Sequence, residues 1–426
     1  MRELLSLAGY WRLAGAAALN ELCWFVATIA LSVLVYRRTG SVLGSSGFFL
    51  CSQAAPAILG PPLVGKLDRR SPRGLLPALY AIEALLYAVL AWLTTRFTLA
   101  PVLSLVVVDG VIALAARSIA TAARTELLKP AGLVREGGAV ASIAFSTAYL
   151  AGPLLGGFVT AIGGTKASLL LNCGVFSVMA LALLSPSVPT STVHEGPERH
   201  RLRAALLHIR RSPPVLALLT MKTLVYICLS IPTPLEVVYS VHVLHAGSTG
   251  YGVLLAVWGG AALVGSVAYA RLRNRSAHLL LGISIVLGAA GFAELAVAPT
   301  LAVALIGALL GGLCTGLLNV VFGVELQEVV PQSWMALAMS VNESLLLLAP
   351  GIGIALGGVI ASLVSVRFAF GVSAASSLVV AAFGLAALAS AQAAELSPAR
   401  DVPLGPGDDR ADRGDTTTES RSHTPA

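Results

Sequence analysis

The sequence has little charge. Asp, Glu, Lys and Arg make up only 12% of its 426 residues, whereas a soluble globular domain carries roughly 25%. Hydrophobic residues reach 56%, and the mean hydropathy is +0.84. Crossing the hydrocarbon layer takes about 20 apolar residues, so a chain of this composition can cross a membrane many times. These values exclude an ordinary soluble protein and predict an all-α, multi-pass membrane protein.

Cysteine and histidine are also sparse. The five cysteines stand singly inside apolar segments, so we interpret them as small buried residues and expect neither a disulfide framework nor a zinc site. His242 and His245 have a spacing that a metal could use, but two loop histidines supply too few ligands. We therefore predict no metal site. The cysteines are Cys23, Cys51, Cys173, Cys228 and Cys314.

A phosphate-binding loop is absent from the sequence. Such a loop needs Gly-x4-Gly-Lys-Ser/Thr, so that backbone N–H groups can surround the phosphates. The nearest segments, Gly65-Lys66 and Gly164-Thr165-Lys166, do not have that spacing. We expect no ATP site and no cofactor, and any transport would draw on an ion gradient or on the gradient of the substrate itself.

Twelve apolar segments are long enough to cross a membrane. Their approximate bounds are 12–36, 43–64, 74–95, 99–122, 139–162, 167–184, 214–239, 250–270, 279–298, 301–324, 336–363 and 369–389. They predict an N-terminal six-helix half at residues 1–185 and a C-terminal six-helix half at residues 214–391. Residues 186–213 would be a cytoplasmic connector with an amphipathic helix, and residues 392–426 would be a disordered cytoplasmic tail.

The cations favour one orientation. With both termini in the cytoplasm, 21 of the 28 Lys and Arg residues face the cytoplasm and five face the opposite side. This bias predicts that both termini lie in the cytoplasm, and we expect a multi-pass protein of the cytoplasmic membrane. The bias also explains the net charge of +7, because the excess cations lie along one face of the lipid bilayer. We therefore expect no nucleic acid as a partner. Because one chain contains both halves, we expect a monomer.

A short sequence segment occurs in both predicted halves and indicates what the protein does. Residues 147–157 read T-A-Y-L-A-G-P-L-L-G-G, and residues 348–358 read L-A-P-G-I-G-I-A-L-G-G. Gly152, Gly156 and Gly157 therefore align, about 201 positions on, with Gly353, Gly357 and Gly358. Two similar halves of about six spans are typical of a secondary transporter whose substrate path lies between them. The sequence thus predicts a transporter and not an enzyme.

Two motifs resemble the major facilitator superfamily, and within it the twelve-helix exporters. Gly65 to Arg73 reads G-K-L-D-R-R-S-P-R and is similar to the superfamily's loop after the second helix. The resemblance implies that Asp68, Arg69 and Arg73 tie the cytoplasmic helix ends together in one conformation. In the fifth span, Gly152, Pro153, Gly156 and Gly157 resemble the Gly-Pro-x-x-Gly-Gly element of exporters that exchange substrate for protons. The small residues allow close helix contact, and Pro153 lets the helix bend.

The fourth span adds a finer resemblance. Val108-Asp109-Gly110 and the small residues after it are similar to the branch that contains the enterobactin exporter and related drug and siderophore exporters. Many proton-coupled drug exporters carry an Arg in the middle of this helix. Here Asp109 lies there, and Arg117 is about two turns nearer the cytoplasm.

Ionisable groups inside the spans are the candidate functional residues, because a central charge there needs a partner or water. The six carboxylates are Glu21, Glu83, Asp109, Glu236, Glu294 and Glu343. In the resembled fold, helices one, four, seven and ten line the cavity. This selects a substrate and proton pathway of Glu21, Asp109, Arg117, Glu236 and Asn319. Glu21 or Asp109 is our candidate for a proton-carrying or cation-binding acid.

Each candidate has a structural alternative. Glu21 and Asp109 could bond only to a neighbouring helix, and Glu236 could be solvated near the outer membrane surface. Arg117 could reach the cytoplasmic interface by snorkelling. Glu83, Glu294 and Glu343 are expected on peripheral or interface helices, where packing or helix–helix bonding would be their role.

Our hypothesis from sequence is a proton-coupled exporter of an amphipathic small molecule, such as a drug, siderophore or metabolite, working by alternating access. Three cavity acids against one arginine favour a cationic or neutral substrate, although an anionic, siderophore-like cargo stays open. A nutrient importer of the same fold is one alternative, and a transport-inactive membrane sensor or scaffold is another. The fifth-span element disfavours the importer, and retained intramembrane acids disfavour the scaffold.

Overall fold

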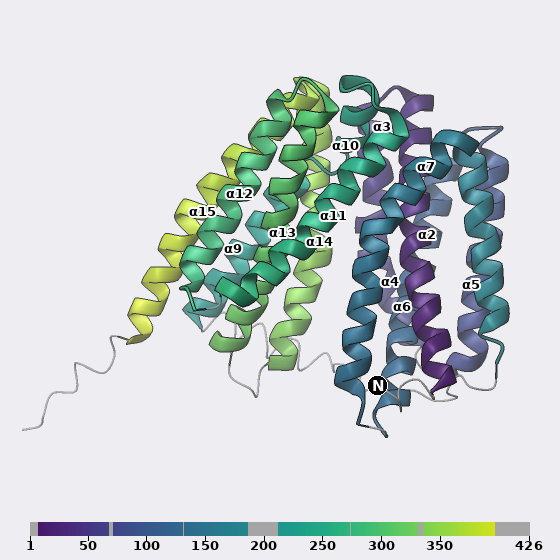
Figure 1. The fold of residues 1–426 in the computed structure, drawn as a ribbon, viewed down its shortest axis with the longest axis horizontal. Helices are drawn as coiled ribbons and strands as arrows, with labels where there is room; N and C mark the ends of the chain where they lie inside the picture. Colours follow the sequence, from purple (N-terminus) through teal and green to yellow (C-terminus); the bar gives the residue numbers. More distant parts are fainter. Residues whose placement is uncertain are drawn as a thin grey trace, which may run out of the picture.

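The computed structural model consists of helices that form two bundles side by side (Figure 1). It describes residues 7–67, 71–130, 132–185, 212–272, 274–330 and 335–396, and no strand occurs among them. The predicted all-α class is confirmed. The predicted tail from residue 397 onward, and residues 186–211 of the predicted connector, lie outside the described residues.

The first bundle, which we call the N-terminal half, begins with α2. This helix ends at Gly40, whose φ of 60° is the left-handed conformation that commonly caps a helix. The second crossing is assembled from three consecutive pieces, of which the middle one, η1, is π-helical. The elements are α2 (Ala8–Thr39), α3 (Val42–Phe49), η1 (Leu50–Ala54), α4 (Ala55–Leu67), α5 (Pro72–Leu93), α6 (Leu99–Leu128) and α7 (Val134–Ala182).

The second bundle, the C-terminal half, has a break in its first crossing. Its first helix stops at Ser230, and a turn containing Pro232 and Pro234 separates it from two short helical pieces. A proline has no N–H to donate and therefore interrupts a helix. The elements are α9 (Pro213–Ser230), α10 (Glu236–Val238), η2 (Tyr239–Val243), α11 (Gly247–Leu272), α12 (Ala277–Val297), α13 (Leu301–Val329), α14 (Met335–Leu363) and α15 (Val366–Leu396).

The long helix α7 makes two crossings. Its backbone leaves helical geometry at Gly164, where φ is 71° and ψ is 177°. Only glycine adopts such a conformation readily, so the chain reverses there, between the spans predicted at 139–162 and 167–184. In the C-terminal half, the corresponding break separates α14 from α15 at residues 364 and 365.

The number of crossings agrees with the sequence. Ten helices among the described residues are long and apolar enough to span a membrane, and a shorter apolar stretch, Leu348–Leu363, belongs to α14. Counting the two arms of α7 separately and including α14 gives the predicted twelve. Large apolar side chains remain exposed on the outside of the bundles, with Leu363 at 78% and Phe383 at 74%. Such a surface suits lipid and not water.

The internal repeat is visible in hydrogen bonds. In the N-terminal half, Asn172 Nδ2 donates to the Cys23 carbonyl of the first helix over 2.8 Å. In the C-terminal half, Ser373 Oγ donates to the Cys228 carbonyl over 2.7 Å. Asn172 and Ser373 are 201 positions apart, and each fastens the last helix of its half to the first. The two halves are therefore built alike.

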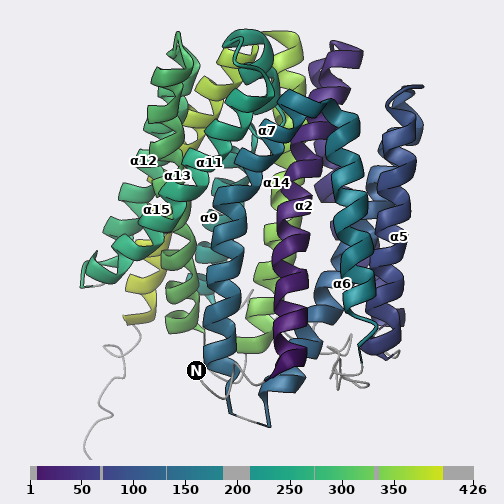
Figure 2. The same cartoon turned by 45° about the vertical axis from the view of Figure 1, so that its right-hand side comes forward.

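The two bundles converge at one end and separate at the other (Figures 1 and 2). The N-terminus lies at the separated end, which we call the N-terminal side, and α15 also ends toward it. The most extensive contacts between the halves join α7 to α11, and α14 to α3 and η1, and smaller contacts join α2 to α10 and to α11.

Candidate functional site

Glu21 and Arg117 form an ion pair inside the N-terminal half. Arg117 Nη2 of α6 lies 2.9 Å from Glu21 Oε1 of α2, and the two side chains are 45% and 12% exposed. Glu21 is near the middle of a 32-residue helix, far from either end of its crossing. The structure thus joins two of the predicted pathway residues, and the partner that an intramembrane carboxylate requires is the arginine.

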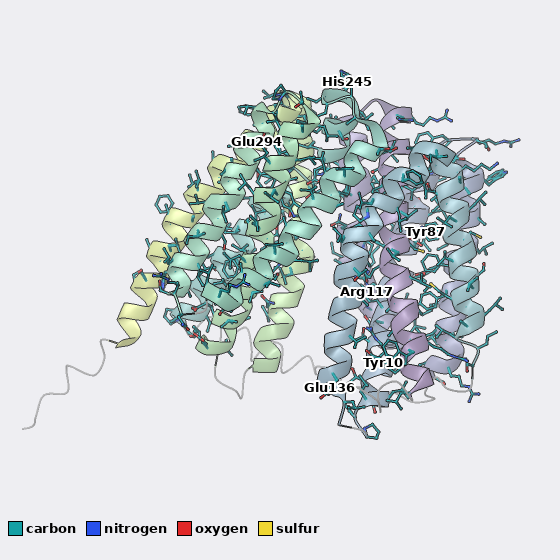
Figure 3. The ribbon with its side chains drawn as sticks, in the orientation of Figure 1. Tyr10, Tyr87, Arg117, Glu136, His245 and Glu294 are labelled. Atoms are coloured by element: carbon teal, nitrogen blue, oxygen red, sulfur yellow. The ribbon has the colours of Figure 1, made fainter. Side chains whose placement is uncertain are left out.

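Asp109 lies on the same helix as Arg117, about two turns away. Its Oδ2 accepts a hydrogen bond of 3.0 Å from the Tyr87 hydroxyl of α5. Its other oxygen, Oδ1, is buried and has no hydrogen-bond partner among the described residues. Tyr87 is held in place because its ring stacks on Phe176 of α7, with the ring centres 5.3 Å apart. Figure 3 labels Tyr87 and Arg117 inside the N-terminal half.

These residues line one cavity, which we call the central cavity. Its volume is about 320 Å³, and Glu21, Asp109 and Arg117 all reach its wall. The remaining wall is mostly apolar and aromatic, and two residues of α14, Leu346 and Pro350, close it from the C-terminal half. A largely apolar cavity of this size with a few converging polar groups is typical of a small-molecule site. Other lining residues include Trp24, Phe25, Phe48, Ser52 and Gln53.

The π-helical piece of the second crossing contributes to this wall. Ser52 and Gln53 both belong to η1 and both line the central cavity. A π-helical turn widens the helix locally and often occurs at functional sites. Nothing in the sequence marked this turn, because its residues have ordinary helical preferences.

The central cavity continues toward the N-terminal side. Glu21 and Arg117 also line a second cavity of about 190 Å³, whose wall includes Arg124. Arg117 lines a third, of about 470 Å³, which reaches Lys129 beyond the end of α6. The ion pair therefore stands at the junction of consecutive cavities that lead from Asp109 to the N-terminal side.

Two predicted pathway residues lie elsewhere. Glu236 begins α10, after the Pro232–Pro234 turn, and lines none of the three cavities described above. Asn319 lies on α13 and accepts a hydrogen bond from the Tyr226 hydroxyl of α9. That contact joins two helices of the C-terminal half, and Asn319 likewise lines none of these cavities. The expected set therefore divides into a cluster of three and two separate residues.

Lys222 is a buried cation that the site prediction passed over. It lies on α9 and is 7% exposed. Its Nζ donates to Asn342 Oδ1 of α14 over 2.7 Å and lies 5.7 Å from the ring centre of Phe322. Lys222 and Leu346 line the same narrow crevice, and Leu346 also lines the central cavity. One feature of the sequence pointed to it. Lys222 is 201 positions after Glu21, which is the offset of the glycine repeat, so the two residues occupy equivalent positions in the two halves.

Glu83 does not form the helix–helix bond expected of it. The side chain is fully buried at 0% exposure, and neither carboxyl oxygen has a hydrogen-bond partner among the described residues. Its sequence neighbours on α5 gave no sign of this. For Glu343, the side chain lies outside the described residues.

The predicted gating loop is only partly described. Asp68 and Arg69 lie outside the described residues, while Arg73 is half-buried in the first turn of α5. The charge pairing that the resemblance implies for this loop therefore stays a prediction.

The repeated glycines make equivalent contacts in the two halves. An added Cβ at Gly152 would lie 2.8 Å from the Phe25 ring of α2, and one at Gly353 would lie 2.9 Å from Ser230 of α9. The next glycine in each element, Gly156 or Gly357, also packs against the first helix of its own half. These glycines allow close helix approach within each bundle.

The third glycine of each element faces the other half instead. A Cβ at Gly157 of α7 would lie 2.7 Å from the Ser248 carbonyl oxygen and 3.1 Å from Gly252 Cα, both on α11. A Cβ at Gly358 of α14 would lie 2.6 Å from Ser46 Cβ of α3. Pro153 also takes part, because its carbonyl oxygen faces Gly252. The repeat therefore contributes to two of the contacts that join the halves opposite the N-terminal side, α7 with α11 and α14 with α3.

Replacing Gly157 with Ala is expected to destabilise this closed contact. The methyl group would meet the backbone of α11, which cannot rotate away, and overpacking of this kind costs about 1–3 kcal/mol. We expect a lower melting temperature for the purified protein in detergent. The matched control is Gly174→Ala, on the second arm of α7, because an added Cβ there meets nothing within 4 Å. Equal melting temperatures for the two variants would contradict the prediction.

A sequence profile identifies the family. The profile of the Major Facilitator Superfamily matches residues 13–337. The chain belongs to the Major Facilitator Superfamily. No curated protein matches the sequence. Because the family consists of membrane transporters, we describe this protein as a multi-pass transporter of the superfamily.

Solved structures with the same fold are also transporters. A mutant of the nucleoside transporter NupG is 15% identical with a TM-score of 0.72, covering 89% of this chain and 99% of its own. A bacterial homologue of the human lysosomal transporter Spinster is 13% identical with a TM-score of 0.70, covering 91% and 98%. A bacterial homologue of the iron transporter ferroportin is 16% identical with a TM-score of 0.68, covering 88% and 98%. At these identities the likeness establishes the fold alone.

Proposed function

We propose that the protein is a proton-coupled exporter of an amphipathic small molecule, with the Glu21–Arg117 ion pair as its coupling switch. The observation that supports this most is the pair itself, joined over 2.9 Å at the junction of the cavities. The pair exists only while Glu21 is ionised. Protonation of Glu21 removes the attraction to Arg117 and frees α2 and α6 to move relative to each other.

Asp109 is the second coupling acid. It lines the central cavity, where it is available to a cargo. A cationic cargo and a proton would compete for this carboxylate, and such competition couples two opposite fluxes. The aromatic and apolar wall around it suits an amphipathic molecule. Arg117 is already paired with Glu21, so Asp109 leaves one uncompensated acid in the central cavity and favours a cationic or neutral cargo.

Orientation follows from the cations. The bias of Lys and Arg supports a cytoplasmic N-terminal side. The described cavities would then open toward the cytoplasm, the side on which an exporter loads its cargo. The Gly-Pro-x-x-Gly-Gly resemblance of residues 152–157 supports export over import. Multi-pass insertion in the cytoplasmic membrane and a monomeric state complete the proposal.

Inverted membrane vesicles test this function. A proton gradient is established in vesicles containing the protein, a panel of lipophilic cations and siderophore-like compounds is added, and lumenal pH is followed by fluorescence. We expect at least one compound to release protons in the wild type but not in Glu21→Gln. Loss of cargo from preloaded vesicles together with the protons would support an importer instead. Absence of flux for every compound with correctly folded protein would favour a sensor or scaffold.

A further inference from the structure

Glu83 occupies a buried position that the proposed coupling switch does not use. It lies on α5, one turn before Tyr87, and is 0% exposed. Both of its carboxyl oxygens lack a hydrogen-bond partner among the described residues. A carboxylate buried without a donor is costly, so such a group is retained only when a proton or another ligand satisfies it.

Polar groups from four helices surround Glu83, although none of them forms a hydrogen bond with it among the described residues. On α5, Tyr80 and Tyr87 lie on either side of it, and on α6, Asp109 and Arg117 lie within electrostatic range. From α2, Cys23 approaches. From α7, Phe176 stacks on Tyr87, and Asn172, about one turn away from Phe176, also has a buried oxygen without a donor among the described residues.

The charges in this cluster do not balance without a proton. Arg117 is already engaged by Glu21 over 2.9 Å, and Asp109 accepts its hydrogen bond from Tyr87. Two ionised carboxylates at Glu83 and Asp109 would repel each other in a site of low polarity. No group of three metal-binding His, Cys, Asp or Glu residues occurs in the described part of the chain.

We propose that Glu83 and Asp109 form a proton-binding site of their own, distinct from the Glu21–Arg117 ion pair. The site holds at least one proton in the conformation described here. Tyr87 and Asp109 both line the central cavity, so they connect the buried Glu83 to water and to cargo. The role of this proton in transport rests on the proposed function, whereas its presence does not.

Infrared difference spectroscopy tests the site without any cargo. The full-length protein is purified, reconstituted in lipid and stepped between pH values, and the C=O stretching band of protonated carboxyl groups is recorded. We expect the wild type to show a band that weakens as pH rises, and Glu83→Gln to show a smaller band, since Glu294 has the other carboxyl group whose two oxygens are both buried without a partner among the described residues. The control is Glu328→Gln, which removes an exposed carboxyl group at the end of α13 and should leave the band in place.

Two further variants keep the test decisive if Glu83→Gln does not fold. Asp109→Asn leaves Glu83 untouched but removes its neighbour, so it should change the pH at which the band weakens. Glu83→Asp retains a carboxyl group and should retain the part of the band that Glu83→Gln loses. Identical spectra for wild type and Glu83→Gln, or a band in the wild type that Asp109→Asn does not alter, would overturn the proposal. Neither result depends on whether the protein exports anything.

Transport then shows what the proton does. In the vesicle assay, we expect Glu83→Gln to release about one proton fewer per cargo molecule than the wild type. An unchanged ratio together with a smaller infrared band would mean that the proton is bound but does not move with the cargo. That result would confine the role of Glu83 to proton binding and leave the coupling to Glu21 and Asp109.

Discussion

Replacing Asp109 with Asn is expected to reduce proton-coupled transport to the level of vesicles that lack the protein. Asn preserves the size of the side chain and can still accept a hydrogen bond from Tyr87, but it cannot exchange a proton or attract a cation. The loss should therefore come from charge and not from packing. Cargo-dependent proton release in inverted vesicles is the measurement, with the amount of folded protein determined in parallel.

The control for Asp109 is Tyr87→Phe. This variant removes the hydroxyl that lies 3.0 Å from Asp109 Oδ2 but keeps the carboxyl group and the aromatic ring. Hydrogen bonds to charged groups contribute about 1.5–3 kcal/mol, so we expect Tyr87→Phe to shift the pH dependence of transport while coupling survives. Equal, complete loss in both variants would point to structural damage. Full activity of Asp109→Asn would contradict a coupling role for Asp109.

Exchanging the charges of Glu21 and Arg117 is expected to distinguish two contributions to transport. One is the attraction between the two side chains, and the other is which helix carries the acid. Either single substitution, Glu21→Arg or Arg117→Glu, places two like charges together in a cavity wall and should abolish transport. The double variant, Glu21→Arg with Arg117→Glu, restores the attraction between opposite charges. We expect it to be more stable than either single variant and to recover part of the transport. Because the proton-carrying acid would then lie on α6 and not on α2, we expect its transport to be about tenfold below wild type, equivalent to about 1.4 kcal/mol.

The three variants form a double-mutant cycle. The readouts are melting temperature and cargo-dependent proton release, measured on the same preparations. Additive effects of the two single substitutions would contradict a direct interaction. Since Arg117 is 45% exposed, water screens part of the attraction, and we expect the coupling to be clearer in transport than in melting temperature.

The sequence singled out Glu21, Asp109 and Arg117, which the structure brings to one cavity, but it did not show how they pair. Glu21 and Arg117 were found because charge is rare in membrane spans, and their helices were placed by the resemblance to the superfamily. Their contact depends on the rotation of α2 against α6, which apolar composition does not specify. Glu236 was expected at the cavity because it is in the first crossing of the C-terminal half. The Pro232–Pro234 turn instead ends α9 before it.

The surroundings of two buried ionisable residues, Glu83 and Lys222, could not be predicted from composition. Glu83 was expected on a peripheral or interface helix, with packing or helix–helix bonding as its role, yet it is buried within electrostatic range of Asp109 and lacks a donor among the described residues. The direction in which a side chain points around a helix that is apolar on all sides cannot be read from its sequence. Lys222 lies within the segment predicted at 214–239, but its relation to Glu21 becomes clear only when the 201-residue offset is applied to charges as well as to glycines.

The glycine repeat was the most informative pattern because it encodes backbone contacts. Gly157 and Gly358 occupy equivalent positions, and each meets the other half of the molecule. Such contacts leave no room for a side chain. The glycine spacing is therefore the same in both copies of the repeat, although the apolar residues around the glycines differ. Apolar side chains exchange freely in lipid-facing positions and carry much less positional information.

The central claim is that protonation of Glu21 changes which side of the protein is open. Distances between pairs of attached spin labels, measured by double electron–electron resonance, test this claim most directly. One label pair, Glu136→Cys with Glu328→Cys, spans the two halves on the N-terminal side, and Figure 3 shows Glu136 at that end. The other pair, Ala100→Cys with Ala302→Cys, occupies exposed first turns of α6 and α13 on the opposite side. The five free cysteines are first replaced, and transport by that background is verified.

We predict that acidification shortens the distance on the N-terminal side and lengthens the one opposite, because it removes an ion pair present when the N-terminal side is open. Glu21→Gln should show the acid-like distances at every pH. Distances in the wild type that do not respond to pH, or a Glu21→Gln variant that responds as the wild type does, would contradict Glu21 as the coupling switch.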